Sequence, residues 1–430
     1  MGMSCVINPL AGCVIAATAT NYHTPFAVGN GKGGHAHGRG ALMKRRNGGM
    51  TCSTRGGSSR PYRLAAASSA EGNAAAGIGI AEFFVGKNLL VTGGTGFLAK
   101  PYVNGERQGV VLEKPFRLGD TIASELASAG SSQHKSGAML DIEAEIKLAF
   151  DSRRHSNDSA SFTQGMKCLG LERAKLHGWQ DTYVFTKAMG EMVINCMRGD
   201  IPVVTIRPSI IESTLRDPFP GWIQGNRMMD PIVVNYGKGH LSGFIADPDC
   251  IIDMVPADMV VSVMLASMAK HGGGAAAPGM HVYHVGSSTS NPLAIGDLVR
   301  FISQHFKRWP VADAAGQPIL VPPFRLFESI DKFTGSEAAA AASSEQRRAR
   351  RFRAKFADQM AHLCSIYRPY TFYGGRFDST NMEKLLAEMS AEERARFNFD
   401  LRSVDWMDYV INVHIPGLRK HIMRLPRNVG

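Results

Sequence analysis

The sequence predicts an α/β fold followed by a mostly helical C-terminal region, and three observations support this prediction. A short apolar, partly β-branched run over 87–92 leads directly into a glycine-rich turn, as a buried parallel strand does. A segment with helical spacing over 181–198 is followed by a second apolar run, 201–208. Beyond it, strand and helix patterns continue to alternate as far as Gly286, which is typical of strands joined by crossover helices.

The N-terminal segment, residues 1–80, differs from the rest of the chain in composition. It is rich in Ala, Gly, Ser and Thr, and no acidic residue precedes Glu71. This composition predicts an organelle transit peptide, and the alternative is a disordered basic tail. Its eight cations are Lys32, Arg39, Lys44, Arg45, Arg46, Arg55, Arg60 and Arg63. Without these eight, the net charge of +11 falls to +3, so the sequence predicts no nucleic-acid partner.

The cysteine pattern and the apolar runs exclude two further classes of protein. The seven cysteines include no Cys-x-x-Cys pair and no His-Cys cluster at metal spacing, so neither a disulfide framework nor a metal site is predicted. The four cysteines after residue 80 suit buried or half-buried thiols in a reducing compartment. No apolar run approaches the length that a bilayer requires. We therefore expect a soluble protein inside an organelle.

The glycine-rich turn that follows 87–92 is the first candidate binding site. Gly93 allows a tight turn, and Gly96 lets the backbone approach a pyrophosphate at the start of the next helix. Such turns are common, so the motif alone is a weak signal, which the preceding strand strengthens. The predicted cofactor residues in this loop are Thr92, Gly93, Thr95, Gly96, Phe97 and Leu98.

The segment from 100 to 182 contains fewer strands than a nucleotide-binding sheet requires. A crossover helix and a second strand ending in a ribose-reading side chain should follow the glycine loop, but Pro101 follows Lys100 at once. The only compact β-branched run is 110–112. The rest of the segment predicts helices over 121–129, 140–152 and 163–175. The sequence therefore predicts an incomplete sheet, and the residue that would choose NADP over NAD is absent.

A tyrosine and a lysine one helical turn apart form the candidate catalytic pair. Tyr183 and Lys187 lie four residues apart in the predicted helix and therefore share one face. In such a pair the phenol can donate a proton to a developing alkoxide, while the ammonium lowers the phenol pKa. The alternative is a surface pair on an amphipathic helix. The buried strand that follows favours the catalytic reading, because its end would place Pro208 and Ile210 beside a nicotinamide.

The later segments continue the α/β pattern and then change character. Strands are predicted over 243–245, 251–255 and 281–286, and a helix over 256–268, with Asp258 favourable to the helix dipole. The Pro322-Pro323 pair and the Ala-rich tract 337–342 resemble an interdomain linker. The basic run 347–355 is most simply a solvated helix face, and binding to RNA or to a membrane surface is the alternative.

Several runs together resemble one protein family. They include TGGTGFL at 92–98 and WQDTYVFTK at 179–187. The full set of matching runs is 91–100, 102–109, 113–120, 178–187, 225–231, 236–240, 253–258, 367–377 and 403–418. They resemble the alcohol-forming fatty acyl reductases, and most closely the plastid-type members, which are also called male-sterility proteins. The resemblance covers most of the chain from 87 to 422.

This resemblance implies a fold, an activity and a location. The fold is a Rossmann-like extended short-chain dehydrogenase/reductase domain over 81–320, with a helical sterile-type domain over 321–430. The activity is reduction of a long-chain acyl thioester, carried on CoA or acyl carrier protein, by NADPH. The aldehyde formed first is reduced by a second NADPH to a primary alcohol. Tyr183 and Lys187 match the catalytic pair, and Lys187 also holds the cofactor. The location is the plastid, and peripheral membrane contact stays open.

The chain departs from the family pattern at one junction. In the family, a strand and a Ser-Thr-Ala segment precede the run that matches 102–105, whereas Lys100-Pro101 abuts that run here. The junction resembles an internal deletion of strands two to five, as a skipped exon or a faulty gene model would produce. Impaired or absent activity is therefore expected. The alternative function is that of a non-catalytic interaction protein.

Overall fold

The computed structural model describes residues 3–7, 14–17, 77–85, 89–92, 101–128, 139–154, 159–272, 279–342 and 347–425. At its centre is a five-stranded sheet with the order β10–β5–β2–β1–β3. Its strands are β1 (Met3–Ile7), β2 (Val14–Ala17), β3 (Leu89–Thr92), β5 (Val203–Pro208) and β10 (Met280–Val285). The strands predicted around 87–92, 201–208 and 281–286 are thereby confirmed.

The central sheet contains both parallel and antiparallel strand pairs. β10 pairs with β5 in parallel along all six residues, and β2 pairs with β5 in parallel. β1 is antiparallel to both of its neighbours, β2 and β3. β3 consequently points the same way as β5, and their C-terminal ends, Thr92 and Pro208, reach the same edge of the sheet.

The two sheet positions between β3 and β5 are filled from the N-terminal segment. β1 and β2 belong to residues 1–80, for which the sequence predicted a transit peptide or disorder. The structure differs from the predicted disorder at these residues, while the transit-peptide role stays a prediction. The expected shortage of strands after the glycine loop is observed: among the described residues of 101–182, β4 (Gly109–Val111) is the only strand, and it lies outside the central sheet.

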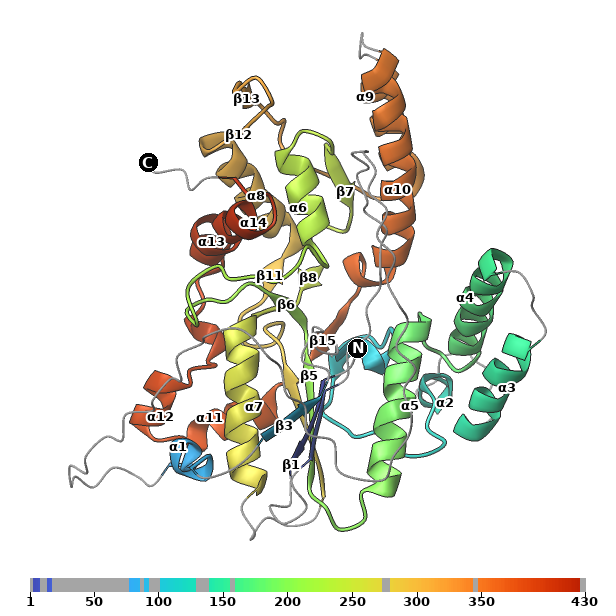
Figure 1. The fold of residues 1–430 in the computed structure, drawn as a ribbon, viewed down its shortest axis with the longest axis vertical. Helices are drawn as coiled ribbons and strands as arrows, with labels where there is room; N and C mark the ends of the chain where they lie inside the picture. Colours follow the sequence, from blue (N-terminus) through green and yellow to red (C-terminus); the bar gives the residue numbers. More distant parts are fainter. Residues whose placement is uncertain are drawn as a thin grey trace, which may run out of the picture. The chain divides into compact units, whose positions relative to one another are not determined.

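Helices cover the sheet, and Figure 1 shows α5 and α7 on either side of β5. The helices of this region are α1 (Ile80–Phe83), α2 (Ile122–Ser128), α3 (Ile142–Arg154), α4 (Ser159–Leu176), α5 (Thr182–Met197), α6 (Asp230–Gly237), α7 (Ala257–Gly272) and α8 (Ile295–Arg308), with the 3-10 turn η1 (Pro101–Asn104). The helices predicted around 121–129, 140–152, 163–175, 181–198 and 256–268 are confirmed to within a few residues.

The described residues also form five two-stranded sheets, and two of these sheets join the predicted domains. β7 (Gly243–Ile245) pairs with β14 (Arg325–Phe327), and β4 pairs with β15 (Gly375–Phe377), both in parallel. Strands from beyond residue 320 therefore extend elements from before it. The other pairs are β6 (Ile210–Glu212) with β9 (Met254–Pro256), β8 (Ile251–Ile252) with β11 (Leu293–Ala294), and β12 (Val311–Ala312) with β13 (Pro318–Ile319). The strand predicted over 251–255 is thus two short strands with different partners.

The C-terminal region is mostly helical, as predicted. Its helices are α9 (Ile330–Ala342), α10 (Arg347–Thr371), α11 (Thr380–Glu388), α12 (Ala391–Arg396), α13 (Trp406–Asp408) and α14 (Ile415–His421), with η2 (Leu401–Ser403) and the π-helix η3 (Tyr409–His414). The linker prediction for 337–342 is wrong, because these residues form the end of α9, which packs along α10. Alanine has the highest helix propensity, which explains why this alanine-rich tract is helical.

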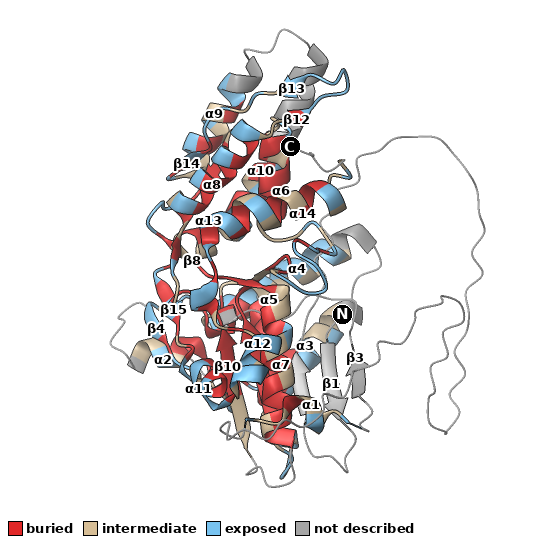
Figure 2. Cartoon of the chain, turned by 90° about the vertical axis from the view of Figure 1, so that its left-hand side faces the viewer, coloured by how far each residue is buried: buried red, intermediate tan, exposed pale blue. Residues whose placement is uncertain are grey.

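The buried residues form one apolar cluster that runs through both predicted domains. Figure 2 shows buried residues along α7 and β10. Cys250 and Cys364 are buried as predicted, whereas Cys168 and Cys196 are exposed, which corrects the prediction for those two thiols. No helix among the described residues combines the length and the apolar character that crossing a membrane requires.

The turn between α4 and α5 depends on a glycine. Gly178 has a φ of 88°, and a Cβ there would lie 2.4 Å from the backbone nitrogen of Ala123. We expect Gly178→Ala to lower the free energy of unfolding by at least about 1 kcal/mol, because the backbone is left-handed and the space is closed. Urea unfolding measures this change.

Gly190 provides the matched control for this prediction. It lies within α5, and a Cβ there would have no atom within 4 Å. Gly190→Ala is therefore expected to stabilise the chain by up to about 1 kcal/mol, from helix propensity alone. Equal effects of the two substitutions would contradict the role assigned to Gly178.

Candidate active site

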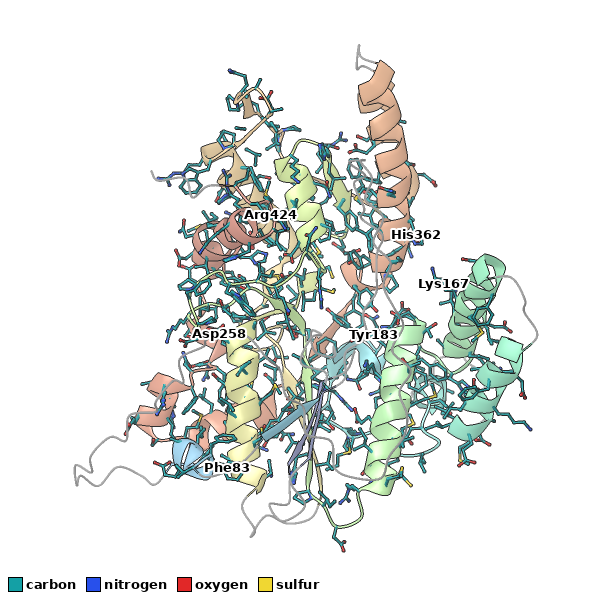
Figure 3. All side chains as sticks on the ribbon, in the orientation of Figure 1. Phe83, Lys167, Tyr183, Asp258, His362 and Arg424 are labelled. Atoms are coloured by element: carbon teal, nitrogen blue, oxygen red, sulfur yellow. The ribbon has the colours of Figure 1, made fainter. Side chains whose placement is uncertain are left out.

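The chain reversal between α5 and β5 brings Tyr183 to the edge of the sheet where β5 ends. From Tyr183 to the end of α5 the helix rises about 21 Å, and β5 returns about 17 Å in the opposite direction. The N-terminal turn of α5 and the last residue of β5, Pro208, therefore lie at similar heights. Figure 3 shows Tyr183 at that end of α5.

The start of α5 is fixed by its N-cap. Asp181 has extended backbone angles, and its carboxylate accepts a hydrogen bond of 2.9 Å from the backbone nitrogen of Val184. This bond satisfies one of the free N–H groups of the first turn. The second carboxylate oxygen of Asp181 accepts a bond of 2.5 Å from the hydroxyl of Tyr370 in α10. The C-terminal region thus holds the first turn of the helix that carries Tyr183.

Tyr183 and Lys187 lie together, as predicted, and Lys187 is the more buried of the two. The Tyr183 side chain is half-buried, and the Lys187 Nζ lies 5.5 Å from the centre of its ring. Lys187 is 9% exposed, and burial lowers the pKa of its ammonium from 10.5 to about 8. A surface pair would have kept an exposed lysine, so this burial argues against the amphipathic-surface alternative. The catalytic roles of both residues stay predictions.

The lowered pKa of Lys187 gives a direct test. Competitive acetylation of the full chain, followed by mass spectrometry, is expected to show Lys187 reacting with a midpoint near pH 8, while a lysine peptide in the same solution titrates near 10.5. Between these two pH values the unfolded chain holds the proton and the folded chain releases it. The contribution of Lys187 to stability therefore rises with pH over this window. A midpoint at or above that of the peptide would contradict the buried placement.

A buried ion pair, which the sequence did not reveal, joins α5 to β5. Glu191 lies one turn beyond Lys187, on the same face of α5. Its two carboxylate oxygens accept bonds from Arg207, at 2.5 Å from Nη2 and 3.1 Å from Nε. Glu191 and Arg207 are 8% and 1% exposed. Because Arg207 immediately precedes Pro208, the pair turns the face that carries Tyr183 and Lys187 toward the sheet.

The ion pair continues into a buried network around His284 of β10. Arg207 Nη1 lies 3.1 Å from His284 Nε2, and burial, together with the charge of Arg207, lowers the pKa of the imidazole. Glu113 accepts bonds from the backbone nitrogens of His284 and Asn381, at 2.8 and 2.7 Å. Burial raises the pKa of the Glu113 carboxyl to about 7. The network links the loop before α2 to the end of the sheet.

The two residues predicted near the nicotinamide lie at the C-terminal edge of the sheet. Pro208 ends β5 and Ile210 begins β6, and both are buried. The backbone between them is held by bonds from Ser209 N to Val285 O (2.9 Å) and from Ile210 N to Asp253 O (3.1 Å). These bonds place both residues in a rigid segment. Their contact with a cofactor stays a prediction.

Most of the predicted cofactor loop lies outside the described residues. This applies to Gly93, Thr95, Gly96, Phe97 and Leu98, and their predicted roles are not tested. Thr92 is the last residue of β3, which ends at the same sheet edge as β5. Its register places it level with Ser4, Ala16 and Thr205 across four strands. Adjacent strands are about 4.8 Å apart, so three steps separate β3 from β5 by about 14 Å.

Asp258 has a larger role than the helix-dipole effect that the sequence suggested. It lies in the first turn of α7, and Figure 3 labels it there. Its carboxylate accepts bonds from the backbone nitrogens of Leu215, Arg216 and Asp217, at 2.8, 2.8 and 3.1 Å. Asp258 therefore fixes the loop that follows β6, just beyond the predicted nicotinamide site. Sequence spacing could not reveal this, because more than 40 residues separate donor and acceptor.

The sequence predicted no metal site, but the structure contains a buried group of side chains that could act as metal ligands. Glu212, Asp230 and His414 place one ligand atom each within 4.8 Å of one another. They come from β6, α6 and η3, which lie far apart in the sequence, so no local residue spacing predicts this cluster. Their chemistry is separate from that of Tyr183 and Lys187.

The comparisons with known proteins show the family to which the chain belongs. Two family models, both described as male sterility protein, match the chain: an NAD-binding model over 101–264 and a sterile model over 340–425. "Fatty acyl-CoA reductase 2, chloroplastic" of Arabidopsis thaliana is 48% identical over 75% of this chain and 54% of its own length. "Fatty acyl-CoA reductase 1" of the same plant is 35% identical over 75% of this chain and 67% of its own length. The chain belongs to the fatty acyl-CoA reductase family.

The chain spans about half the length of the first of these relatives, 54%. A further relative, the "Alcohol-forming fatty acyl-CoA reductase" of Simmondsia chinensis, is 35% identical over 75% of this chain and 66% of its own length. Among solved structures, the terminal R domain of the myxalamid PKS-NRPS pathway is distantly similar, with a TM-score of 0.36, 15% identity and coverage of 58% of this chain and 52% of that one.

The family matches fall on the two parts of the chain that the site joins. The NAD-binding match begins at Pro101, directly after the glycine loop, and includes Tyr183 and Lys187. The sterile match includes Tyr370, which bonds to the N-cap of α5. The two matched regions therefore meet at the candidate active site.

Proposed function

We propose that the chain reduces a long-chain fatty acyl thioester to a primary alcohol with NADPH. The observation that carries this proposal is the placement of Tyr183 and Lys187, with Lys187 buried, at the sheet edge where β5 ends. That edge is where parallel sheets bind dinucleotides. The family relationship supplies the substrate class. Either acyl-CoA or acyl carrier protein can present the thioester, and the plastid is the proposed location.

The buried Lys187, with its Nζ 5.5 Å from the centre of the Tyr183 ring, supports binding of the nicotinamide half of the cofactor. When bound, NADPH supplies the hydride. The first reduction consumes one NADPH and one proton, and it releases the aldehyde and the free thiol. The second consumes another NADPH and another proton, and it yields the alcohol. In the second step the Tyr183 phenol donates its proton to the forming alkoxide. The Lys187 ammonium lowers the phenol pKa and would hold the nicotinamide ribose of the bound cofactor.

One observation favours a second candidate, a catalytically impaired form. β3, which leads into the glycine loop, pairs with the antiparallel strand β1 from the N-terminal segment. In a doubly wound sheet this position is held by a parallel strand reached through a crossover helix. The adenosine half of the cofactor would therefore lie against an antiparallel strand from the N-terminal segment instead of the usual parallel strand. Such a chain could keep its fold and act only as an interaction protein.

Two measurements on the full chain separate these candidates. The first is NADPH titration followed by cofactor fluorescence, with NADH as the comparison. The second is NADPH oxidation with a long-chain acyl-CoA, or with the acyl carrier protein thioester, with the alcohol identified by mass spectrometry. Binding with alcohol formation would support the proposed activity. Binding without turnover would favour the impaired form, and absence of both would contradict the proposed reductase.

A further inference from the structure

Three buried side chains of metal-ligating type, from three different elements, meet at one point. Glu212 ends β6, Asp230 begins α6, and His414 ends the π-helix η3. They are 1%, 1% and 4% exposed. One ligand atom of each lies within 4.8 Å of the other two. Buried charges are costly unless they are paired or bind a metal, and His414 lies within ion-pair distance of both carboxylates.

The separations fit ligands around a shared ion better than they fit hydrogen bonds. His414 Nε2 lies 3.2 Å from Asp230 Oδ1 and 3.7 Å from Glu212 Oε2. A charge-assisted hydrogen bond of this type measures about 2.7–2.9 Å. Two ligands on a tetrahedral ion, with bonds of about 2.1 Å, lie about 3.4 Å apart. The two measured separations lie on either side of that value.

An oxygen atom of Asp230 gives independent support. Among the described residues, Asp230 Oδ1 has no hydrogen-bond partner, although it is buried and lies beside the ring of His414. The other oxygen of Asp230, Oδ2, accepts a bond of 3.1 Å from the backbone nitrogen of Arg227. That bond fixes the carboxylate with Oδ1 directed into the cluster. Buried polar atoms of this kind are rare in folded proteins and indicate a strained or ligand-binding position.

The ring of His414 is held in the orientation that a metal ligand needs. Its Nδ1 lies 3.1 Å from Ser213 Oγ, which leaves Nε2 for the two carboxylates. Metal-bound imidazoles use their second nitrogen in this way. The ring of Tyr409 stacks on His414 at 5.9 Å, and the Tyr409 hydroxyl donates a bond of 2.6 Å to Ser213 O. Both residues lie in a π-helix, an irregularity that often marks functional sites.

We propose that Glu212, Asp230 and His414 bind one divalent transition-metal ion, for which Zn²⁺ is the probe. Two carboxylates and one imidazole suit zinc or manganese, whereas calcium and magnesium sites are built from oxygen ligands. The ion would join the C-terminal region, through η3, to β6 and α6. This site would stabilise the junction of the two family regions, and it does not depend on the proposed reductase activity.

The test uses the full chain, purified without a histidine tag. Its metal content is measured by mass spectrometry, and it is then stripped with a chelator and titrated with Zn²⁺ by calorimetry. About one ion per chain is expected, together with a rise in the unfolding temperature that Mg²⁺ does not reproduce. Asp230→Asn and His414→Gln are expected to weaken binding by more than the ~10- to 100-fold that losing an outer hydrogen-bond partner costs.

His305→Gln is the matched control, because this histidine is also buried and contacts the same π-helix. It is 2% exposed, and its Nδ1 lies 2.8 Å from Ile411 O. This variant should bind Zn²⁺ as the parent chain does. Should the ligand variants fail to fold, the absorption spectrum of the parent chain loaded with Co²⁺ reports the ligand set directly. A chain that binds no Zn²⁺, or ligand variants that bind it equally well, would overturn the proposal.

Discussion

Tyr183→Phe is expected to slow the reduction of the aldehyde to the alcohol by about 10²- to 10⁴-fold, the range that a positioned general acid contributes. The substitution removes the phenol proton and keeps the ring, which lies 5.5 Å from Lys187 Nζ. Since the ring and Lys187 remain, NADPH binding should change little. The loss should therefore appear in kcat rather than in KM. Single-turnover assays measure this effect even if the parent chain is slow.

Thr186→Ala is the matched control for this prediction. Thr186 lies in the same turn of α5 and is exposed, and its hydroxyl donates a bond of 2.9 Å to the backbone oxygen of Tyr183. Its removal should leave turnover within a few-fold of the parent chain. Circular dichroism verifies that both variants keep the helix. A Tyr183→Phe variant with the turnover of the parent chain would show that another group donates the proton.

Glu191→Gln is expected to cost about 3–5 kcal/mol of folding free energy, because it leaves the guanidinium of Arg207 buried without its counter-charge. Arg207 is 1% exposed, and both oxygens of Glu191 accept bonds from it. A cost of this size is a large fraction of the stability of an ordinary domain. Urea unfolding, with a check that the m-value is unchanged, measures it.

Two comparisons show whether burial causes this cost. Lys270 and Glu388 form a pair of 2.7 Å with both side chains partly exposed, so Glu388→Gln should cost less than about 1 kcal/mol. A double variant, Glu191→Leu with Arg207→Met, should be more stable than Glu191→Gln, because no buried charge is left. A small cost for Glu191→Gln would mean that Arg207 finds another partner or that water reaches it.

The sequence predicted most secondary-structure elements because their signals are local. The strands at β3, β5 and β10 and the helices α2 to α5 follow from apolar runs, helical spacing and turn residues. The segments where the prediction failed are those in which the pattern was ambiguous. The alanine tract 337–342 was read as a linker and is helical, and the run 251–255 divides between β8 and β9.

By itself, the sequence determined the Tyr183–Lys187 face of one helix, the strand that follows it and the shortage of strands after the glycine loop. Each of these features is encoded within a few consecutive residues, where helical and strand periodicity act. Only the tertiary structure decided that Lys187 is buried, that Glu191 pairs with Arg207, and that β1 and β2 lie between β3 and β5. It also decided the meeting of Glu212, Asp230 and His414. These contacts join residues far apart in the chain, and they form only because apolar burial folds separate segments onto each other.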